Sequence, residues 1–186
     1  MEKVSERTNA VVTYLVGQIA IAATVGLSYF TMTIANKTEY LTGLAALANF
    51  ADIRWANILR AGVIYSPGAV MGITMGAYES NLYLGKGGPY FVMPLINLVV
   101  GMAAFNYAKK IGHSLFKDMA VAGVYGLVMG IFVTMNIATW AALLTPGPWT
   151  KLLAAGALWK ILTHIFVPMI GVLGYYGVKY VKNLSN

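Results

Sequence analysis

Long apolar runs, broken only by short polar segments, follow one another along the chain. Residues 10–35 contain no charged side chain, and about 20 predominantly apolar residues are enough for an α-helix to cross a bilayer. The apolar–polar alternation of transmembrane β-strands is not found. The pattern predicts an all-α integral membrane protein, in which residues 1–186 form a single transmembrane domain, a compact bundle of about six helices. The expected helices cover residues 9–35, 41–51, 55–78, 90–109, 119–144 and 150–182.

Prolines, glycines and one acidic residue mark the breaks between these helices. Pro67 is expected to kink the third helix, and a glycine-rich loop over residues 79–88 is expected to separate it from the fourth. Asp118 is placed to cap the fifth helix. The second helix, over residues 41–51, is too short to cross a bilayer alone at about 1.5 Å per residue. Its crossing therefore has to be argued from the charges.

The basic residues are distributed unevenly between the two sets of helix ends. With six crossings, one side would hold Lys3, Arg7, Arg54, Lys109, Lys110, Lys117, Lys179 and Lys182, and the other only Lys37, Lys86 and Lys151. Lysine and arginine accumulate in the cytoplasmic loops of membrane proteins. We therefore expect both termini to be cytoplasmic, the second helix to cross, and the protein to be a multi-pass component of the cell (plasma) membrane.

Composition and charge narrow the function classes. Hydrophobic residues make up 59% of the chain and charged residues 10%, against about 25% charged in soluble domains. The net charge of +7 is explained by the lysines and arginines that accumulate on the cytoplasmic side of a membrane protein. We therefore expect the lipid bilayer, and no nucleic acid, as a partner. The chain has no cysteine, its acidic residues lack metal-ligand spacing, and GKGG at 85–88 lacks the phosphate-loop spacing. We expect a protein that is not an enzyme and has no metal or cofactor.

Small residues recur every four positions on two of the expected helices. Gly68, Gly72 and Gly76 form a double GxxxG pattern, and Ala22 with Gly26 forms a weaker one. Small residues let membrane helices approach closely. These faces either pack helices together within the chain, which is the commoner use, or dock a partner helix.

Four polar residues lie deep inside expected helices, where polar groups are costly. They are Asn97, Asn136, Lys160 and His164. Lys160 and His164 are four positions apart and share one helix face. Either Lys160 extends toward the interface while His164 hydrogen-bonds a carbonyl, or the pair lines a wet cavity that meets an anionic or polar ligand.

Further candidates lie around the expected outer loops. Glu79, Asn81, Lys86 and Tyr90 surround the connection between the third and fourth helices, and Trp140 lies at the corresponding level of the fifth. Tyrosine and tryptophan at this depth are more often interfacial belt residues, but they can also close over a flat ligand. The expected substrate-binding set is therefore Glu79, Asn81, Lys86, Tyr90, Asn97, Asn136, Trp140, Lys160 and His164.

The middle of the chain resembles the substrate-binding (S) components of energy-coupling factor (ECF) transporters. The resemblance lies in DIRWANI (52–58), SPGAVMGITMGAYE (66–79) and GKGGPYFVMPLINLVVGMAAFNYAKK (85–110). It implies a membrane subunit that binds a vitamin, a vitamin precursor or a similar small molecule in an outward-facing pocket. It also implies two kinds of partner, a transmembrane coupling protein and two cytoplasmic ATPases. In that family, small residues of the first helix face the coupling protein, and the nearest match here is Ala22 with Gly26.

A second interpretation stays open from the residues alone. The chain could be a structural or accessory subunit of a larger membrane complex, with permanent glycine-mediated interfaces and no ligand pocket. An outward cavity between the fourth, fifth and sixth helices, lined by Lys160, His164 and polar loop residues, would favour the transporter subunit. Aliphatic side chains filling that space would favour the accessory subunit.

Overall fold

A computed structural model describes residues 2–37, 55–144 and 157–184 of the chain. The elements in these ranges are α1 (Glu2–Lys37), η1 (Trp55–Ile64), α3 (Pro67–Tyr83), η2 (Gly88–Phe91), α4 (Val92–Ile111), α5 (Leu115–Leu144) and α7 (Ala157–Leu184). No strand occurs in the described ranges. The prediction of an all-helical chain is thereby confirmed for these residues.

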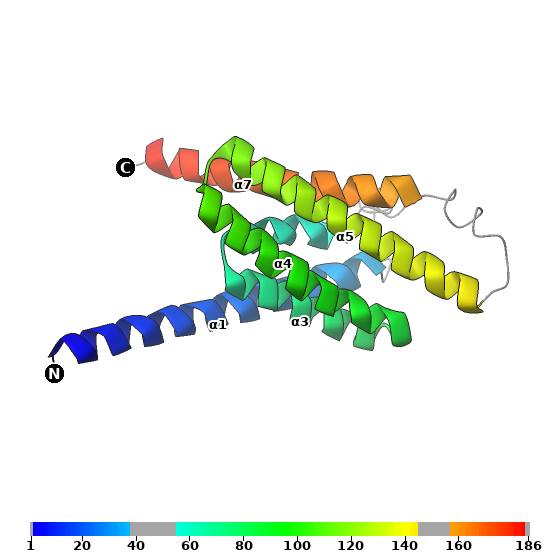
Figure 1. Cartoon of the computed structure of the whole chain (residues 1–186), viewed down its shortest axis with the longest axis horizontal. Coiled ribbons are helices and arrows are strands. Elements are labelled where there is room, and N and C mark those ends of the chain that lie inside the picture. Colours follow the sequence, from blue (N-terminus) through cyan, green and yellow to red (C-terminus); the bar gives the residue numbers. More distant parts are fainter. Residues whose placement is uncertain (1, 38–54, 145–156, 185–186) are drawn as a thin grey trace.

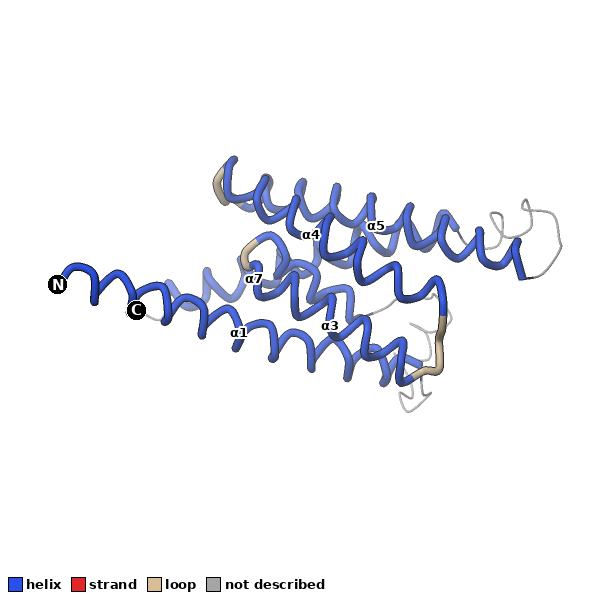
Figure 2. The backbone as a smooth tube through the Cα atoms, turned by 60° about the horizontal axis from the view of Figure 1, so that its bottom comes forward, coloured by secondary structure: helices blue, strands red, loops and turns tan. Residues whose placement is uncertain are grey.

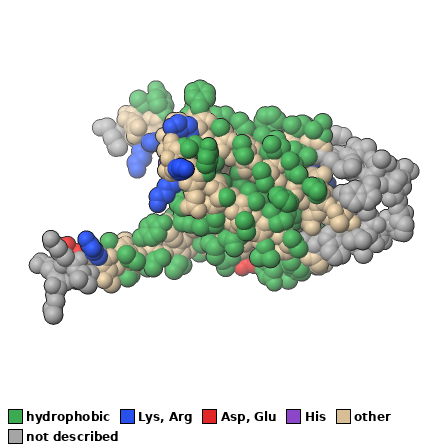
Figure 3. Space-filling view, viewed as in Figure 1, with side chains coloured by type: hydrophobic (Ala, Val, Ile, Leu, Met, Phe, Trp, Pro, Cys, Tyr) green, Lys and Arg blue, Asp and Glu red, His purple; other side chains and the backbone are tan. Residues whose placement is uncertain are grey.

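Four described helices are long and apolar enough to cross a membrane. The apolar spans are Glu6–Ala35 in α1, Val92–Ile111 in α4, Leu115–Asn136 in α5 and Leu158–Leu184 in α7. Apolar side chains cover much of the outer surface of the bundle (Figure 3), as expected where lipid is the solvent. The count of six crossings stays a prediction, because the expected helix over residues 41–51 lies outside the described residues.

The helices run back and forth between two ends of the bundle. α1 begins and α7 ends at the same end, and the turn between α4 and α5 lies there too (Figures 1 and 2). α1 lies along α3, and α5 lies along α7. The short helix η1 contacts all five of the described α-helices. The side chains of η1 are therefore surrounded by the rest of the bundle.

The expected third helix, over residues 55–78, is two helices and not one kinked helix. The ten-residue 3₁₀-helix η1 ends at Ile64, and α3 begins at Pro67. Ser66 has an extended backbone and its side chain accepts a hydrogen bond from the amide of Ala69. A serine cap followed by proline in the first turn starts a helix. The prediction of a kink at Pro67 was therefore wrong.

Two further boundaries differ from the predictions. α3 continues to Tyr83, so Glu79 lies inside a helix and not in the loop expected over residues 79–88. α5 begins at Leu115, which places Asp118 in the first helical turn. The amide of Lys117 donates to the side chain of Ser114 (3.4 Å), so a serine ahead of the helix takes the capping position predicted for Asp118.

The glycine patterns pack helices together within the chain. A Cβ atom added to Gly72 would lie 2.5 Å from the carbonyl oxygen of Ala22 and 2.9 Å from the nitrogen of Gly26. Cβ atoms added to Gly68 and Gly76 would also clash with the α1 backbone. The five residues expected to dock a partner helix therefore face one another across the α1–α3 contact, which leaves that face no room for another chain.

Candidate functional site

The most unusual side chain of the bundle is Arg60, on the central helix η1. It is 6% exposed, because η1 is surrounded by the five α-helices. Its Nη2 donates a hydrogen bond to the hydroxyl of Tyr29 on α1 (3.3 Å), and that hydroxyl donates to Oδ1 of Asn57 (3.5 Å). A buried arginine ordinarily pairs with a carboxylate, because removing its charge from water is costly. Here the described partner of Arg60 is a neutral hydroxyl.

Hydrogen-bond donors are left over in this cluster. Nε and Nη1 of Arg60 and Nδ2 of Asn57 are buried and have no acceptor among the described residues. Nearly all buried polar groups in native proteins have a partner. All three groups are donors, so a partner for them would be an acceptor, and the guanidinium charge favours an anionic one.

Arg60 lines a small cavity of about 60 Å³, whose walls are both apolar, from residues such as Met93, Met129 and Val133, and polar. Its polar lining comes from α1, η1, α3, α4 and the segment between α3 and α4, namely Tyr29, Thr33, Arg60, Ser80, Asn81, Lys86, Tyr90 and Asn97. The described lining contains two cationic side chains, Arg60 and Lys86, and no carboxylate. This lining suits an anion and would repel a metal cation.

The end of the cavity near η2 is built from the connection between α3 and α4. Nδ2 of Asn81 donates to the carbonyl of Tyr90 (2.8 Å), which holds this connection against α3. The ammonium of Lys86 lies over the ring of Tyr90, 4.9 Å from its centroid. A cation over an aromatic face is stabilised by the ring. These contacts position Lys86 as the second positive charge of the cavity.

Asn97 contributes to the opposite wall and is held by a chain of hydrogen bonds. Its Oδ1 accepts from the hydroxyl of Tyr125, and its Nδ2 donates to Oγ1 of Thr74 (3.0 Å). That hydroxyl in turn donates to the carbonyl of Val70 (2.8 Å). Asn97 is therefore a fully bonded part of the wall, in contrast to Arg60.

Four of the nine predicted substrate-binding residues line this cavity, which are Asn81, Lys86, Tyr90 and Asn97. Glu79, Asn136, Lys160 and His164 do not line it. Glu79 is exposed and borders a separate apolar hollow on the outer face of α3 and α4. Asn136 is half-buried on α5. The side chain of Trp140 lies outside the described residues.

Lys160 and His164 share one face of α7, as predicted, but they line no part of this cavity. Nδ1 of His164 makes a hydrogen bond with the carbonyl of Lys160 (2.8 Å). The same turn of α7 packs on the glycines of α5, because a Cβ atom at Gly126 would clash with the His164 carbonyl and one at Gly130 would lie 3.0 Å from Cα of Ile161. The outward cavity lined by Lys160 and His164, which would have favoured the transporter subunit, is therefore not found among the described residues, because α5 and α7 are in close contact at this turn. The polar cavity lies elsewhere, around η1.

The sequence reasoning missed Arg60, Asn57 and Tyr29. A signal for Arg60 was present, since it is a charged residue inside an apolar stretch, and such residues in membrane segments are usually functional. Asn57 lies three positions before it and shares its face on a 3₁₀-helix. Nothing in the sequence pointed to Tyr29, which reaches the cluster from a different helix.

We compared the chain with protein-family models, with curated proteins and with solved structures, and none of them matches. The candidate site is therefore defined by the geometry of this chain alone.

Proposed function

We propose that this protein is a membrane-embedded, non-enzymatic binding subunit of an ATP-driven importer of the ECF type. Its ligand would be a small molecule with an anionic group, such as a vitamin or a vitamin precursor. The observation that carries the proposal is the buried, incompletely bonded guanidinium of Arg60 beside a polar cavity.

The chemistry of the cluster supports an anionic ligand. A guanidinium binds a carboxylate or phosphate through two parallel hydrogen bonds, and Nε and Nη1 of Arg60 both lack an acceptor in the part of the chain that the structure describes. Nδ2 of Asn57 adds a neutral donor beside them, and Lys86 adds a second charge. In a site of low dielectric constant, these interactions are much stronger than they would be in water.

The size of the cavity limits what it receives. Pockets for complete small molecules are typically about 300–1,000 Å³, whereas this one measures about 60 Å³. We therefore propose that it receives the charged group of the ligand. The α3–α4 connection with Lys86 and Tyr90 lies at the end of the bundle opposite the start of α1 (Figure 1), which is the external end in the proposed orientation.

The proposed orientation places the chain ends in the cytoplasm. Lys109 and Lys110 close α4, Lys117 begins α5, and Lys179 with Lys182 lie near the end of α7. These segments lie at one end of the bundle, where blue side chains gather in Figure 3. Basic residues favour the cytoplasmic side. The coupling protein and the two ATPases would act from there, and they would use a surface other than the α1–α3 glycine contact.

Native mass spectrometry of the purified protein tests this proposal. We expect the wild type to retain a small anionic molecule, and the Arg60→Met variant to lose it. Lys110→Gln removes an exposed charge far from the cavity and serves as the matched control, which should retain the molecule. A wild type with no retained molecule, or one that purifies only with redox or metal-containing subunits, would exclude the binding subunit and favour an accessory role.

A further inference from the structure

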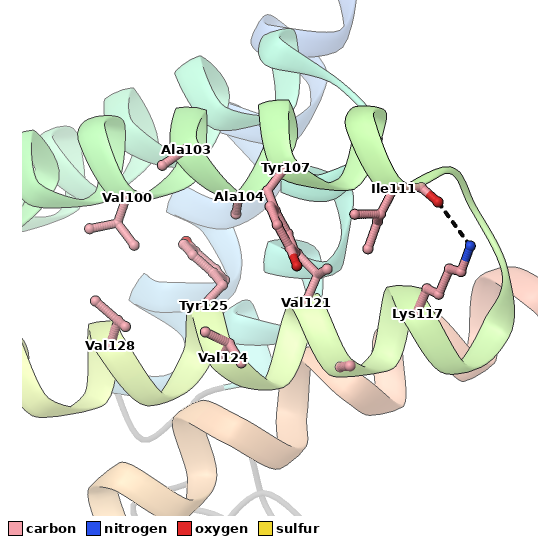
Figure 4. A pocket seen from close by; sticks show the side chains of 11 residues that line it. Val100, Ala103, Ala104, Tyr107, Ile111, Lys117, Val121, Val124, Tyr125 and Val128 are labelled. Carbon is pink, nitrogen blue, oxygen red and sulfur yellow. Dashed lines mark hydrogen bonds between the residues drawn. The ribbon is translucent and has the colours of Figure 1, made fainter.

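A second hollow lies between α4 and α5, separate from the cavity at Arg60. It has a volume of about 580 Å³ and is open to the outside. Aliphatic side chains such as Val100, Val124 and Val128 line it, and alanines at 103, 104 and 120 make the space (Figure 4). The groove runs from the middle of both helices to the turn that joins them, where Ile111 and Lys117 lie.

The two ends of this groove differ in charge. Lys117 lies at the turn, and its Nζ donates to the carbonyl of Ile111 (2.9 Å), as Figure 4 shows. Lys109 and Lys110 are exposed in the last turn of α4. The acidic residue of this turn, Asp118, is fully buried and cannot neutralise them at the surface. The groove is therefore apolar along its length and has the positive charge of Lys117 at one end.

We propose that the groove binds one anionic phospholipid of the surrounding bilayer. An acyl chain lies between Val100 and Val128, and the headgroup phosphate meets Lys117, with the exposed Lys110 beside it in the last turn of α4. Basic pockets between membrane helices on the cytoplasmic side are suited to anionic headgroups. The side chain of Tyr107 borders the groove (Figure 4), and its hydroxyl is placed to bond the ester region of the lipid. The proposal rests on the membrane location and not on the ligand of the Arg60 cavity.

The positive charge at the end of the groove favours an anionic phospholipid over a protein as the occupant. A partner helix or a second copy of this chain would need an apolar stripe, and neither would need a lysine at the end of the groove. The anionic leaflet supplies both an acyl chain and a negative headgroup. Its lipids are also present wherever the helices span a membrane.

The test uses the complete protein extracted from nanodiscs that contain equal amounts of phosphatidylglycerol and phosphatidylcholine. Native mass spectrometry should show one retained phosphatidylglycerol. The double variant Lys110→Gln/Lys117→Gln should lower the preference for phosphatidylglycerol by about fivefold for each lysine removed. The variant Lys179→Gln/Lys182→Gln removes two charges at the same end of the bundle, away from the groove, and should leave the preference unchanged.

A second variant fills the groove without entering the core. Ala103 and Ala120 are exposed groove residues, so Ala103→Phe/Ala120→Phe should abolish lipid retention while Arg60→Met leaves it intact. Lipid retained equally by all variants, equal retention of the two lipids by the wild type, or a dimer that only the groove-filling variant disrupts would each overturn the proposal. Arg60→Met should release only the small anionic molecule of the Arg60 cavity, and the groove variants should release only the lipid. The two proposals can therefore fail separately.

Discussion

Two buried charged side chains of this protein have opposite surroundings. Asp118, 0% exposed at the start of α5, accepts a hydrogen bond from the hydroxyl of Tyr176 (2.9 Å) and lies 3.0 Å from Nδ1 of His113. Arg60, 6% exposed in η1, has the hydroxyl of Tyr29 as its described partner and two nitrogens without one. Both charges are costly to bury. Among the residues 2–37, 55–144 and 157–184, the first charge is compensated and the second is incompletely compensated.

The surroundings of Asp118 explain what it does. It joins the α4–α5 turn to α7, and the ring of Tyr65, from the turn before α3, lies against His113 (5.3 Å) and Tyr175 (4.4 Å). Burial, and then the Asp118 carboxylate, raise the pKa of the Tyr65 phenol above its usual range. Three separate segments therefore meet at one compensated charge, which indicates a structural role.

The partners of a buried charge distinguish a structural side chain from a functional one. A compensated charge contributes to stability when its partners are present, whereas an incompletely compensated one lowers the stability of the empty protein. Proteins retain such costs at functional sites. The two side chains should therefore respond in opposite directions when they are replaced.

Replacement of Asp118 should have the largest effect on stability. Asp118→Ala removes the carboxylate that Tyr176 and His113 share, and the loss of one partner from a buried polar cluster costs about 3–5 kcal/mol. Unfolding in increasing mole fractions of dodecyl sulfate should start at a lower fraction than for the wild type. Asp118→Asn keeps an acceptor for Tyr176 and should fall between the two. An unchanged unfolding curve for Asp118→Ala would contradict the structural role.

Replacement of Arg60 should change stability in the opposite direction. Arg60→Met removes the buried charge and keeps an unbranched apolar side chain, so the ligand-free protein should gain about 1–3 kcal/mol. The same variant should lose any stabilisation by anionic ligands in the dodecyl sulfate titration. A ligand-free protein that becomes less stable would mean that Arg60 is structural like Asp118. Lys110→Gln replaces an exposed side chain, so it should alter neither the stability of the ligand-free protein nor its stabilisation by anionic ligands.

A matched pair of tyrosine variants distinguishes the Arg60 cluster from the Asp118 cluster. Tyr29→Phe leaves one more donor of Arg60 without a partner, and Tyr176→Phe removes one donor to Asp118. Each change should cost about 1 kcal/mol, as the loss of a buried hydrogen bond does. Isothermal titration with the anion identified by native mass spectrometry should separate them, because Tyr29→Phe should alter the affinity and Tyr176→Phe should not. Equal effects on affinity would place both clusters in one cooperative unit.

The sequence predicted the helices well, because its apolar runs and breaks are local features. Each apolar span of α1, α4, α5 and α7 overlaps a predicted helix and extends two to four residues past one of its predicted ends. The break between η1 and α3 was not predicted as such, although Ser66 and Pro67 together start a helix. A kink and a new helix leave similar patterns in the sequence. Side-chain contacts across the chain decide between them, here that of Ser66 Oγ with Oε1 of Gln18 on α1 (2.7 Å).

The candidate site was only half predictable. Asn81, Lys86 and Tyr90 were found because they are close in the sequence and frame one connection. Lys160 and His164 were correctly placed on a single helix face, but spacing cannot show what that face meets, and it meets glycines of α5. The burial of Arg60 depends on five helices that converge on η1, which no local pattern encodes.

The smallest effect on stability should come from Lys86, the second cation of the Arg60 cavity. Its side chain is half-buried beside Tyr90, so Lys86→Gln should change the unfolding free energy by no more than about 0.5 kcal/mol. The affinity for the anion should still fall by about tenfold, because a charge facing the same small cavity is removed, and raising the salt concentration should reduce the difference between the variant and the wild type. Lys86→Arg keeps the charge and should retain most of the affinity. An affinity that is the same in all three proteins would leave Arg60 as the sole charge that binds the anion, and would restrict the site to the buried cluster of Arg60, Asn57 and Tyr29.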